Sequence, residues 1–290
     1  MWMTALRHTV WPKIRQDKAS FLALLFIALI TALAIFAPWV APHNPVEQNI
    51  ANAFQGPSSA YWLGTDEYGR DVLSRIIYGA RPALVVGLLS VAFSMIIGIP
   101  IGILAGLHMG WLDRLVGWGV DIMLAFPPLL MALLVVTLLG SSLPILVAAI
   151  GISSIPLFIR LARSSTLVVK NLDFVHMARS YGATNTRIVL CHILPNIIGP
   201  IIVMGTLSIA GAVREEASLS FLGMGVLPPA ASWGNLIRDG IANVFDAPAL
   251  AVLPGIVLTL SVFAFNMVGD TLRDVLDPRG LTNRRPSVKR

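Results

Sequence analysis

Charged residues and cysteine are both scarce in this 290-residue sequence. Asp, Glu, Lys and Arg make up 12% of the chain and hydrophobic residues 56%, whereas soluble domains typically carry about 25% charged residues. A water-soluble fold of this length has too little interior for so much apolar surface, but a bilayer accepts helices that are apolar on every side. The composition therefore predicts an all-α integral membrane protein.

Several kinds of site are excluded by what the sequence lacks. The single cysteine, Cys191, has no partner for an intrachain disulfide and cannot build a cysteine metal cluster. The five histidines are without the H-E-x-x-H spacing of a metalloprotease. None of the four lysines follows a glycine, so a phosphate-binding G-x-x-x-x-G-K-[S/T] loop is missing. We therefore expect no catalytic residue, no metal and no cofactor in this chain.

Six apolar runs are long enough to cross a bilayer, which takes about 20 residues per helix. The third run holds Pro127 and Pro128 in its middle, and such a helix is tolerated where neighbouring protein satisfies the freed carbonyls. The second run carries glycines at 87, 98, 102 and 106, which are small enough for close helix packing. The predicted spans are residues 21–40, 83–107, 116–139, 143–159, 196–213 and 249–268.

The distribution of positive charge predicts the topology. With the N-terminus inside, the cytoplasmic pieces hold 16 of the 21 Lys and Arg residues. The positive-inside rule therefore favours cytoplasmic N- and C-termini. The same rule accounts for the net charge of +6, together with contacts to anionic membrane lipid. No basic patch is interleaved with the aromatic residues that stack on bases, so we expect no nucleic-acid partner.

The two predicted outer loops contain further structure. In the first, Thr65 and Asp66 are a candidate N-cap for a helix that lies on the membrane surface. The second, residues 215–247, is too short and too broken by Gly and Pro to span, and we expect it to dip into the interface. In the surface helix, Val72, Leu73, Ile76 and Ile77 form the apolar side, and Arg70, Asp71, Ser74 and Arg75 form the wetter side.

The basic loop at residues 160–195 contains the start and stop signals of two short helices. Asp173 can cap a helix over residues 174–181, and Gly182 can take the left-handed position that ends it. Thr184 can cap a second helix that ends before Pro195. The result is a compact cytoplasmic knob whose side near Gly182 lacks bulk. An ordinary surface hairpin and a docking site for another protein both fit this pattern.

Several motifs resemble those of a known family, the permease subunits of ABC importers for dipeptides, oligopeptides and nickel. The stretch FVHMARSYG (174–182), followed by ILPN (193–196), resembles the family's E-A-A-x-x-x-G loop with its later L-P. The stretches WLGTDE (62–67), GRDV (69–72), EASLSFLG (216–223), SWG (232–234) and LDPR (276–279) resemble signatures of the second, C-type permease. The resemblance extends over most of the chain.

The resemblance implies a type I ABC-importer permease (MetI-like) fold with six spans in a bacterial inner membrane. It also implies that the knob docks in a groove of a cytoplasmic ATPase. His176 and Met177 depart from the family, which has Glu and Ala there, and His176 cannot supply the negative charge that favours a helix N-terminus. The residues implied in ATPase coupling are Asp173, His176, Met177, Ala178, Gly182, Leu194 and Pro195.

The expected function is half of a translocation path for a peptide-like or nickel-type solute. The implied partners are a second homologous permease, two ABC ATPase subunits that bind ATP and Mg²⁺, and an extracytoplasmic solute-binding protein. Arg214, Glu215 and Glu216 are candidates for the path or a gate, although a local ion-pair cluster is the simpler reading. Asp121 fits a solvated or arginine-paired anchor better than a proton relay.

Two other function classes leave different signatures in a sequence. An ion-coupled secondary transporter would show inverted repeats and ionisable groups at the bilayer midplane. An intramembrane hydrolase would place a histidine in a predicted span. Neither signature is visible. We divide the chain into residues 1–82 (first span and outer loop), 83–272 (permease core with the 160–195 loop) and 273–290 (basic cytoplasmic tail).

Overall fold

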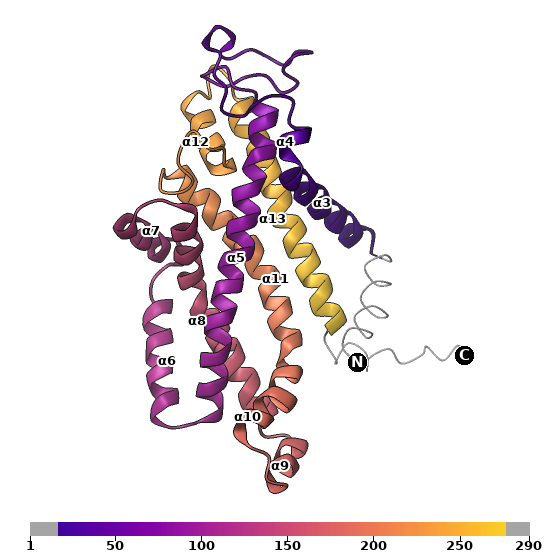
Figure 1. Cartoon of the computed structure of the whole chain (residues 1–290), viewed down its shortest axis with the longest axis vertical. Coiled ribbons are helices and arrows are strands. Elements are labelled where there is room, and N and C mark those ends of the chain that lie inside the picture. The colour runs from indigo at the N-terminus through magenta and orange to yellow at the C-terminus, as the bar shows by residue number, and fades with distance from the viewer. Residues whose placement is uncertain (1–16, 277–290) are drawn as a thin grey trace, which may run out of the picture.

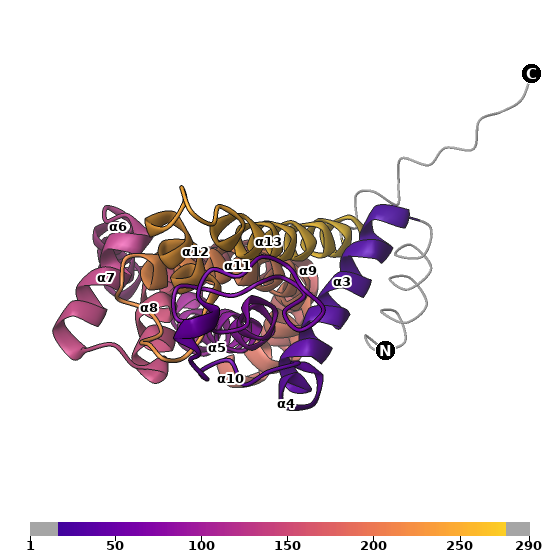
Figure 2. The same ribbon diagram turned by 90° about the horizontal axis from the view of Figure 1, so that it is seen from above.

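The computed structural model describes residues 17–276, and every regular element in that range is helical. Five long helices form the body, with α6 and α7 on one flank and α3 on the opposite flank (Figures 1 and 2). The long helices are α3 (Lys18–Ile35), α5 (Val72–Leu107), α8 (Leu143–Val169), α11 (Leu194–Phe221) and α13 (Ala249–Leu276). The shorter ones are α4 (Ala37–Val40), η2 (Ile50–Asn52), α6 (Trp111–Leu124), α7 (Pro128–Leu139), α9 (Asp173–Ser180), α10 (Asn185–Ile188), η3 (Val189–Ile193) and α12 (Trp233–Ala242).

The predicted spans agree with these helices in number. Five helices are long and apolar enough to cross a membrane, and the bent pair α6–α7 makes a sixth if it is counted as one span. The knob elements α9 and α10 lie at one end of the bundle and α12 lies at the other (Figure 1). We refer to these as the α9 end and the α12 end.

The second span begins eleven residues earlier than the sequence predicts. Asp71 caps α5 by accepting from the Ser74 amide at 2.8 Å, and the helix then runs through Pro82 to Leu107 without a break. The predicted surface helix with a Thr65–Asp66 cap is therefore wrong, because Asp71 is the cap and residues 72–77 are the first turns of a spanning helix. A proline inside a membrane helix is tolerated where neighbours satisfy the freed carbonyl. The predicted domain boundary at residue 82 consequently falls inside α5.

The third span is broken at Pro127 and Pro128. The axes of α6 and α7 differ by 87°, because two successive prolines remove two amide donors and fix two φ angles. Pro128 starts α7, where a missing amide costs nothing. Ala132 and Val136 of α7 are buried against α8. The pair of prolines thus ends one helix and starts another, where the sequence predicted a single helix of residues 116–139.

Glycines let α5 and α8 pack closely. A Cβ atom added to Gly102 would lie 2.4 Å from the Ile159 carbonyl, and one added to Gly98 would lie 2.8 Å from the Phe158 Cβ. Small residues four apart are the usual means by which membrane helices approach. Of the four glycines predicted as packing positions, Gly98, Gly102 and Gly106 lie at the contact with α8, whereas Gly87 lies against Val213 and Ile209 of α11.

Candidate functional site

The knob at the α9 end is shaped by local capping. We define it as residues 170–193. Gly182 has φ +81°, and the amides of Gly182 and Ala183 donate to the carbonyls of Arg179 and Ala178 at 3.0 Å each. This is a Schellman motif, which closes α9 and turns the chain. Thr184 then caps α10 by accepting from the Arg187 amide at 3.4 Å. The predicted roles of Gly182 and Thr184 are confirmed.

Two details of the predicted knob are wrong by short distances. The N-cap of α9 is Leu172, so Asp173 is the first helical residue and His176 is the fourth. The second helix does not end before Pro195. It passes through the π-helical turn η3 and continues as α11, with Pro195 in the first turn of α11. Leu194 and Pro195 therefore belong to the base of a spanning helix.

Apolar side chains fix the knob to the bundle. Val175, Ile188 and Ile193 are at most 1% exposed, and they pack with Ile103 of α5 and Ala162 of α8. Complete burial of a valine or isoleucine side chain contributes about 1.5–3 kcal/mol. These buried side chains therefore anchor the knob to α5 and α8.

The tip of the knob exposes large apolar side chains. Tyr181 is 91% exposed, Met177 57% and Phe174 38%, and His176 and Asp173 are also exposed. A Cβ atom added to Gly182 would meet nothing within 4 Å. Exposed apolar groups beside a bulk-free position are typical of a protein contact surface.

A polar network that we call the clasp occupies the α12 end. Its members are Asp66, Glu67, Arg70, Arg75, Arg238 and Asp239. Asp66 Oδ1 accepts from the Arg70 amide at 3.0 Å, and its Oδ2 accepts from Arg70 Nε at 2.6 Å. Arg75 Nε lies 3.4 Å from the same Oδ2 atom. One carboxylate therefore faces two buried guanidinium groups.

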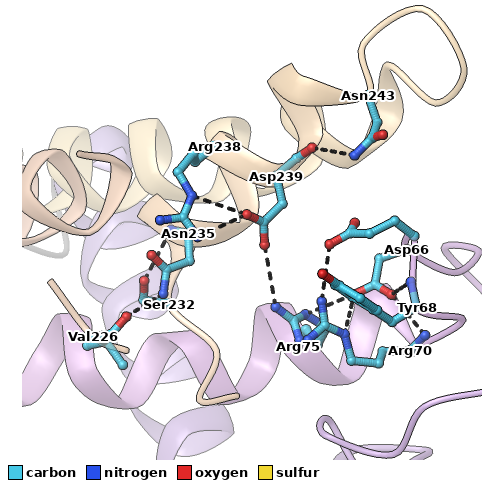
Figure 3. A network of polar contacts seen from close by, with 11 residues as sticks. Asp66, Tyr68, Arg70, Arg75, Val226, Ser232, Asn235, Arg238, Asp239 and Asn243 are labelled. Carbon is cyan, nitrogen blue, oxygen red and sulfur yellow. Dashed lines mark hydrogen bonds and ion pairs between the residues drawn. The ribbon is translucent and has the colours of Figure 1, made fainter. Parts of the chain in front are cut away.

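The clasp joins the loop before α5, and the start of α5 itself, to α12. Arg75 Nη2 lies 4.0 Å from Asp239 Oδ2, and Arg238 donates to Asp239 Oδ1 at 3.1 and 3.2 Å. Figure 3 shows Arg75 of α5 between Asp66 and Asp239. Beside it, Trp233 Nε1 donates to the Ile76 carbonyl at 3.0 Å. These contacts bind segments more than 150 residues apart.

The helix side that the sequence predicted to face water is instead buried in and around the clasp. Arg70, Asp71, Ser74 and Arg75 are at most 4% exposed, because α12 and the loop cover them. Outside the spans, burial raises the pKa of Glu67, and the charges of Asp66 and Asp239 raise it further. The close spacing of opposite charges between residues 66 and 75 is the sequence signal that could have indicated a buried ion-pair network.

Arg214, Glu215 and Glu216 point in different directions because successive residues on a helix are about 100° apart. Glu216 is fully buried and accepts from Ser220 Oγ at 2.7 Å. Arg214 is exposed. Glu215 lies against Ser153 of α8. None of the three takes part in an ion pair within residues 17–276, so the predicted local ion-pair cluster is not what the structure shows.

Asp121 is paired, as predicted, with an arginine. Arg160 Nη2 donates to Asp121 Oδ1 at 3.0 Å, and both side chains are well exposed. Nearby, Arg163 donates to both carboxylate oxygens of Asp113. In residues 17–276, no group of three or more His, Cys, Asp or Glu side chains is placed to hold a metal.

The comparison with known families decides the identity of the chain. Residues 98–280 match the family described as binding-protein-dependent transport system inner membrane component, and residues 6–57 match the N-terminal TM domain of oligopeptide transport permease C. The chain belongs to this permease family. Its members are inner-membrane permease subunits of ABC importers, and ATP hydrolysis lies in separate subunits.

Individual relatives support this assignment. The permease is 41% identical to the dipeptide transport system permease protein DppC of Alkalihalophilus pseudofirmus over 92% of this chain and 88% of the relative. It is 40% identical to the glutathione transport system permease protein GsiD of Pectobacterium atrosepticum, over 93% and 90%. It is 41% identical to the GsiD protein of Escherichia coli O157:H7, over 94% and 90%.

Solved structures confirm the predicted MetI-like fold. A chain of the methionine ABC transporter MetNI, in an inward-facing conformation, superposes with a TM-score of 0.58 at 19% identity. The match covers 69% of the permease and 96% of the MetNI chain. The permease is therefore a multi-pass inner-membrane protein that works with ATPase and solute-binding subunits. Nothing in these comparisons supports an ion-coupled secondary transporter.

Proposed function

We propose that this permease imports small peptides and that its knob docks on a cytoplasmic ATPase. The solute class follows from the relatives, whose names specify dipeptide and glutathione transport. The docking role follows from the tip, because Tyr181, Met177 and Phe174 are apolar and exposed on a rigidly anchored base. A rigid knob transmits the movement of a bound ATPase directly to α8 and α11.

The proposed orientation places the α9 end in the cytoplasm, with both termini inside. Positive charge supports it, since Arg163, Lys170, Arg179 and Arg187 all lie near this end. Cys191 is exposed on the knob, so a membrane-impermeant thiol reagent should miss it in intact cells and label it in inverted vesicles. Labelling from outside intact cells would refute the orientation.

In the proposed complex, a second homologous permease completes the path, and two ATPase subunits hold ATP and Mg²⁺. A binding protein delivers the peptide at the α12 end. This chain needs no cofactor of its own in that arrangement. Of the three candidate path residues, Arg214 is exposed, Glu215 is half-buried and Glu216 is buried.

The docking role can be tested with Met177→Ser combined with Tyr181→Ala. We expect ATP-dependent uptake of alanyl-alanine by reconstituted vesicles to fall at least tenfold, and copurification of the ATPase to fall in parallel. The control is Leu22→Ala, because Leu22 is 62% exposed on α3, on the flank that carries neither the knob nor the α12 end. Equal uptake by the double variant and the control would contradict the docking role.

A further inference from the structure

The ion pair between Asp121 and Arg160 lies within the depth of the bundle and yet is exposed. The side chains are 70% and 61% exposed. At 1.5 Å per residue, Asp121 lies about 15 Å from the start of α6, and Arg160 about 26 Å from the start of α8 and about 14 Å from its end. Charges at such a depth are rare on lipid-facing surfaces and normally face a water-filled cavity or the interior of a bundle.

Arg160 belongs to a polar stripe on α8. Ser153 and Ser164 lie seven residues before it and four residues after it, and a helix places these positions on one face. Ser164 and Arg160 are exposed, and Ser153 is half-buried. The stripe therefore extends from the upper part of α8 down to the level of the ion pair.

A second stripe on α11 meets the first. Glu215 lies against Ser153, and Ser208, seven residues earlier, is on the same face of α11. Between them, a Cβ atom added to Gly211 would meet nothing within 4 Å. The two helices run in opposite directions along the sequence, so Ser208 lies near the level of Arg160. The surface shared by these stripes carries several polar side chains and has room beside Gly211.

The opposite flank of the molecule has a different surface. The exposed side chains of α3 include Leu22, Leu25 and Leu29, and those of α13 include Leu260 and Phe263. That flank suits lipid tails. The contrast favours water beside the polar stripes, because lipid would leave the charges of Asp121 and Arg160 unsolvated.

We propose that Asp121, Ser153, Arg160, Ser164, Ser208 and Glu215 form one wall of the solute passage, and that their opposite charges recognise a zwitterionic solute. Either carboxylate can pair with an ammonium group, and the guanidinium group can pair with a carboxylate. The charge recognition rests on the proposed import of peptides. The water-lined wall does not depend on which solute is carried.

Thiol accessibility tests the wall. In a Cys191→Ser chain within the complete transporter, Ser164→Cys and Ser208→Cys should react with methanethiosulfonate-ethylammonium at least tenfold faster than Leu260→Cys on the lipid-facing flank. The vesicles are permeabilised so that the reagent reaches both sides. Wall cysteines that react as slowly as the Leu260→Cys control would overturn the proposal and indicate a dry protein contact.

A charge-specific assay tests recognition. The ratio of uptake rates for alanyl-alanine and alanyl-alanine amide is compared between wild type, Arg160→Gln and Asp121→Asn, all with the same binding protein, so that its own selectivity cancels. We expect the ratio to fall at least fivefold in Arg160→Gln and to stay unchanged in Asp121→Asn. Equal ratios in all three proteins would overturn charge recognition. If wild type imports neither compound, the proposed peptide function fails, whereas the thiol test still judges the wall.

Discussion

Replacement of Asp66 by asparagine removes the charge that Arg70 and Arg75 share in the clasp. Asp66 is 3% exposed, and its Oδ2 atom lies 2.6 Å from Arg70 Nε and 3.4 Å from Arg75 Nε. The clasp contains three acidic and three basic side chains, so Asp66→Asn leaves one uncompensated positive charge in a buried network. Breaking a buried ion pair from one side typically costs about 3–5 kcal/mol.

Thermal unfolding of the purified protein in detergent measures this cost. For a chain of this size, 1 kcal/mol lowers Tm by about 2–4 °C, so we expect Asp66→Asn to lower the apparent Tm by roughly 6–20 °C. Glu47→Gln is the matched control, because Glu47 lies exposed in the same loop before α5, and a surface substitution changes stability by about 0.5 kcal/mol or less.

A double variant separates charge imbalance from lost packing. Arg75→Gln in addition to Asp66→Asn restores the charge balance of the clasp, so its effect should be smaller than the sum of the two single effects. The reasoning would be refuted if Asp66→Asn lowered Tm no more than Glu47→Gln does.

Three further variants test other parts of the structure. Gly102→Ala should destabilise the protein by about 1–3 kcal/mol, because the added methyl group overpacks against α8. Gly119→Ala should stabilise it by up to about 1 kcal/mol, because its added Cβ atom meets nothing within 4 Å. Equal Tm shifts for the two variants would contradict this reasoning. In the folded protein the pKa of Glu67 is raised from its ordinary value of 4.5. Protonation of Glu67 therefore stabilises the fold fully below pH 4.5, and this stabilisation is lost as the pH rises through the folded-state pKa. The Tm of Glu67→Gln should therefore rise relative to the Tm of wild type as the pH is raised from 4 to 8. A fall in this difference would contradict the raised pKa of Glu67. His176→Glu should stabilise α9 by a few tenths of a kcal/mol through the helix dipole and increase ATPase copurification; unchanged docking and uptake would show that position 176 carries little of the coupling.

The parts of the fold that depend on local chemistry were predictable from the sequence. Apolar runs of about 20 residues located the spanning helices, and the glycine at 182 with the threonine at 184 gave the knob its two-helix shape. These signals are short in range, because a cap or an apolar turn acts on its immediate neighbours. The N-cap of α9 differs by only one residue from the predicted position.

The clasp could not be predicted in the same way. The sequence placed Arg75 on a solvent-facing side of a helix. Its partner Asp239 lies more than 160 residues away in the sequence, and only the tertiary fold brings the two side chains together. Pro82 similarly suggested a helix start, although the surrounding helices allow α5 to continue through it. The π-helical turn at residues 189–193 has no simple sequence signal, so the continuation of α10 into α11 was missed.

The central claim is that the knob contacts an ATPase, and a site-specific crosslink tests it most directly. A photoreactive benzoylphenylalanine at position 177, in the complete complex within membranes, should crosslink to an ATPase subunit. The same group at position 245, at the α12 end, should not. Crosslinking to the ATPase from position 245, with none from position 177, would contradict the account.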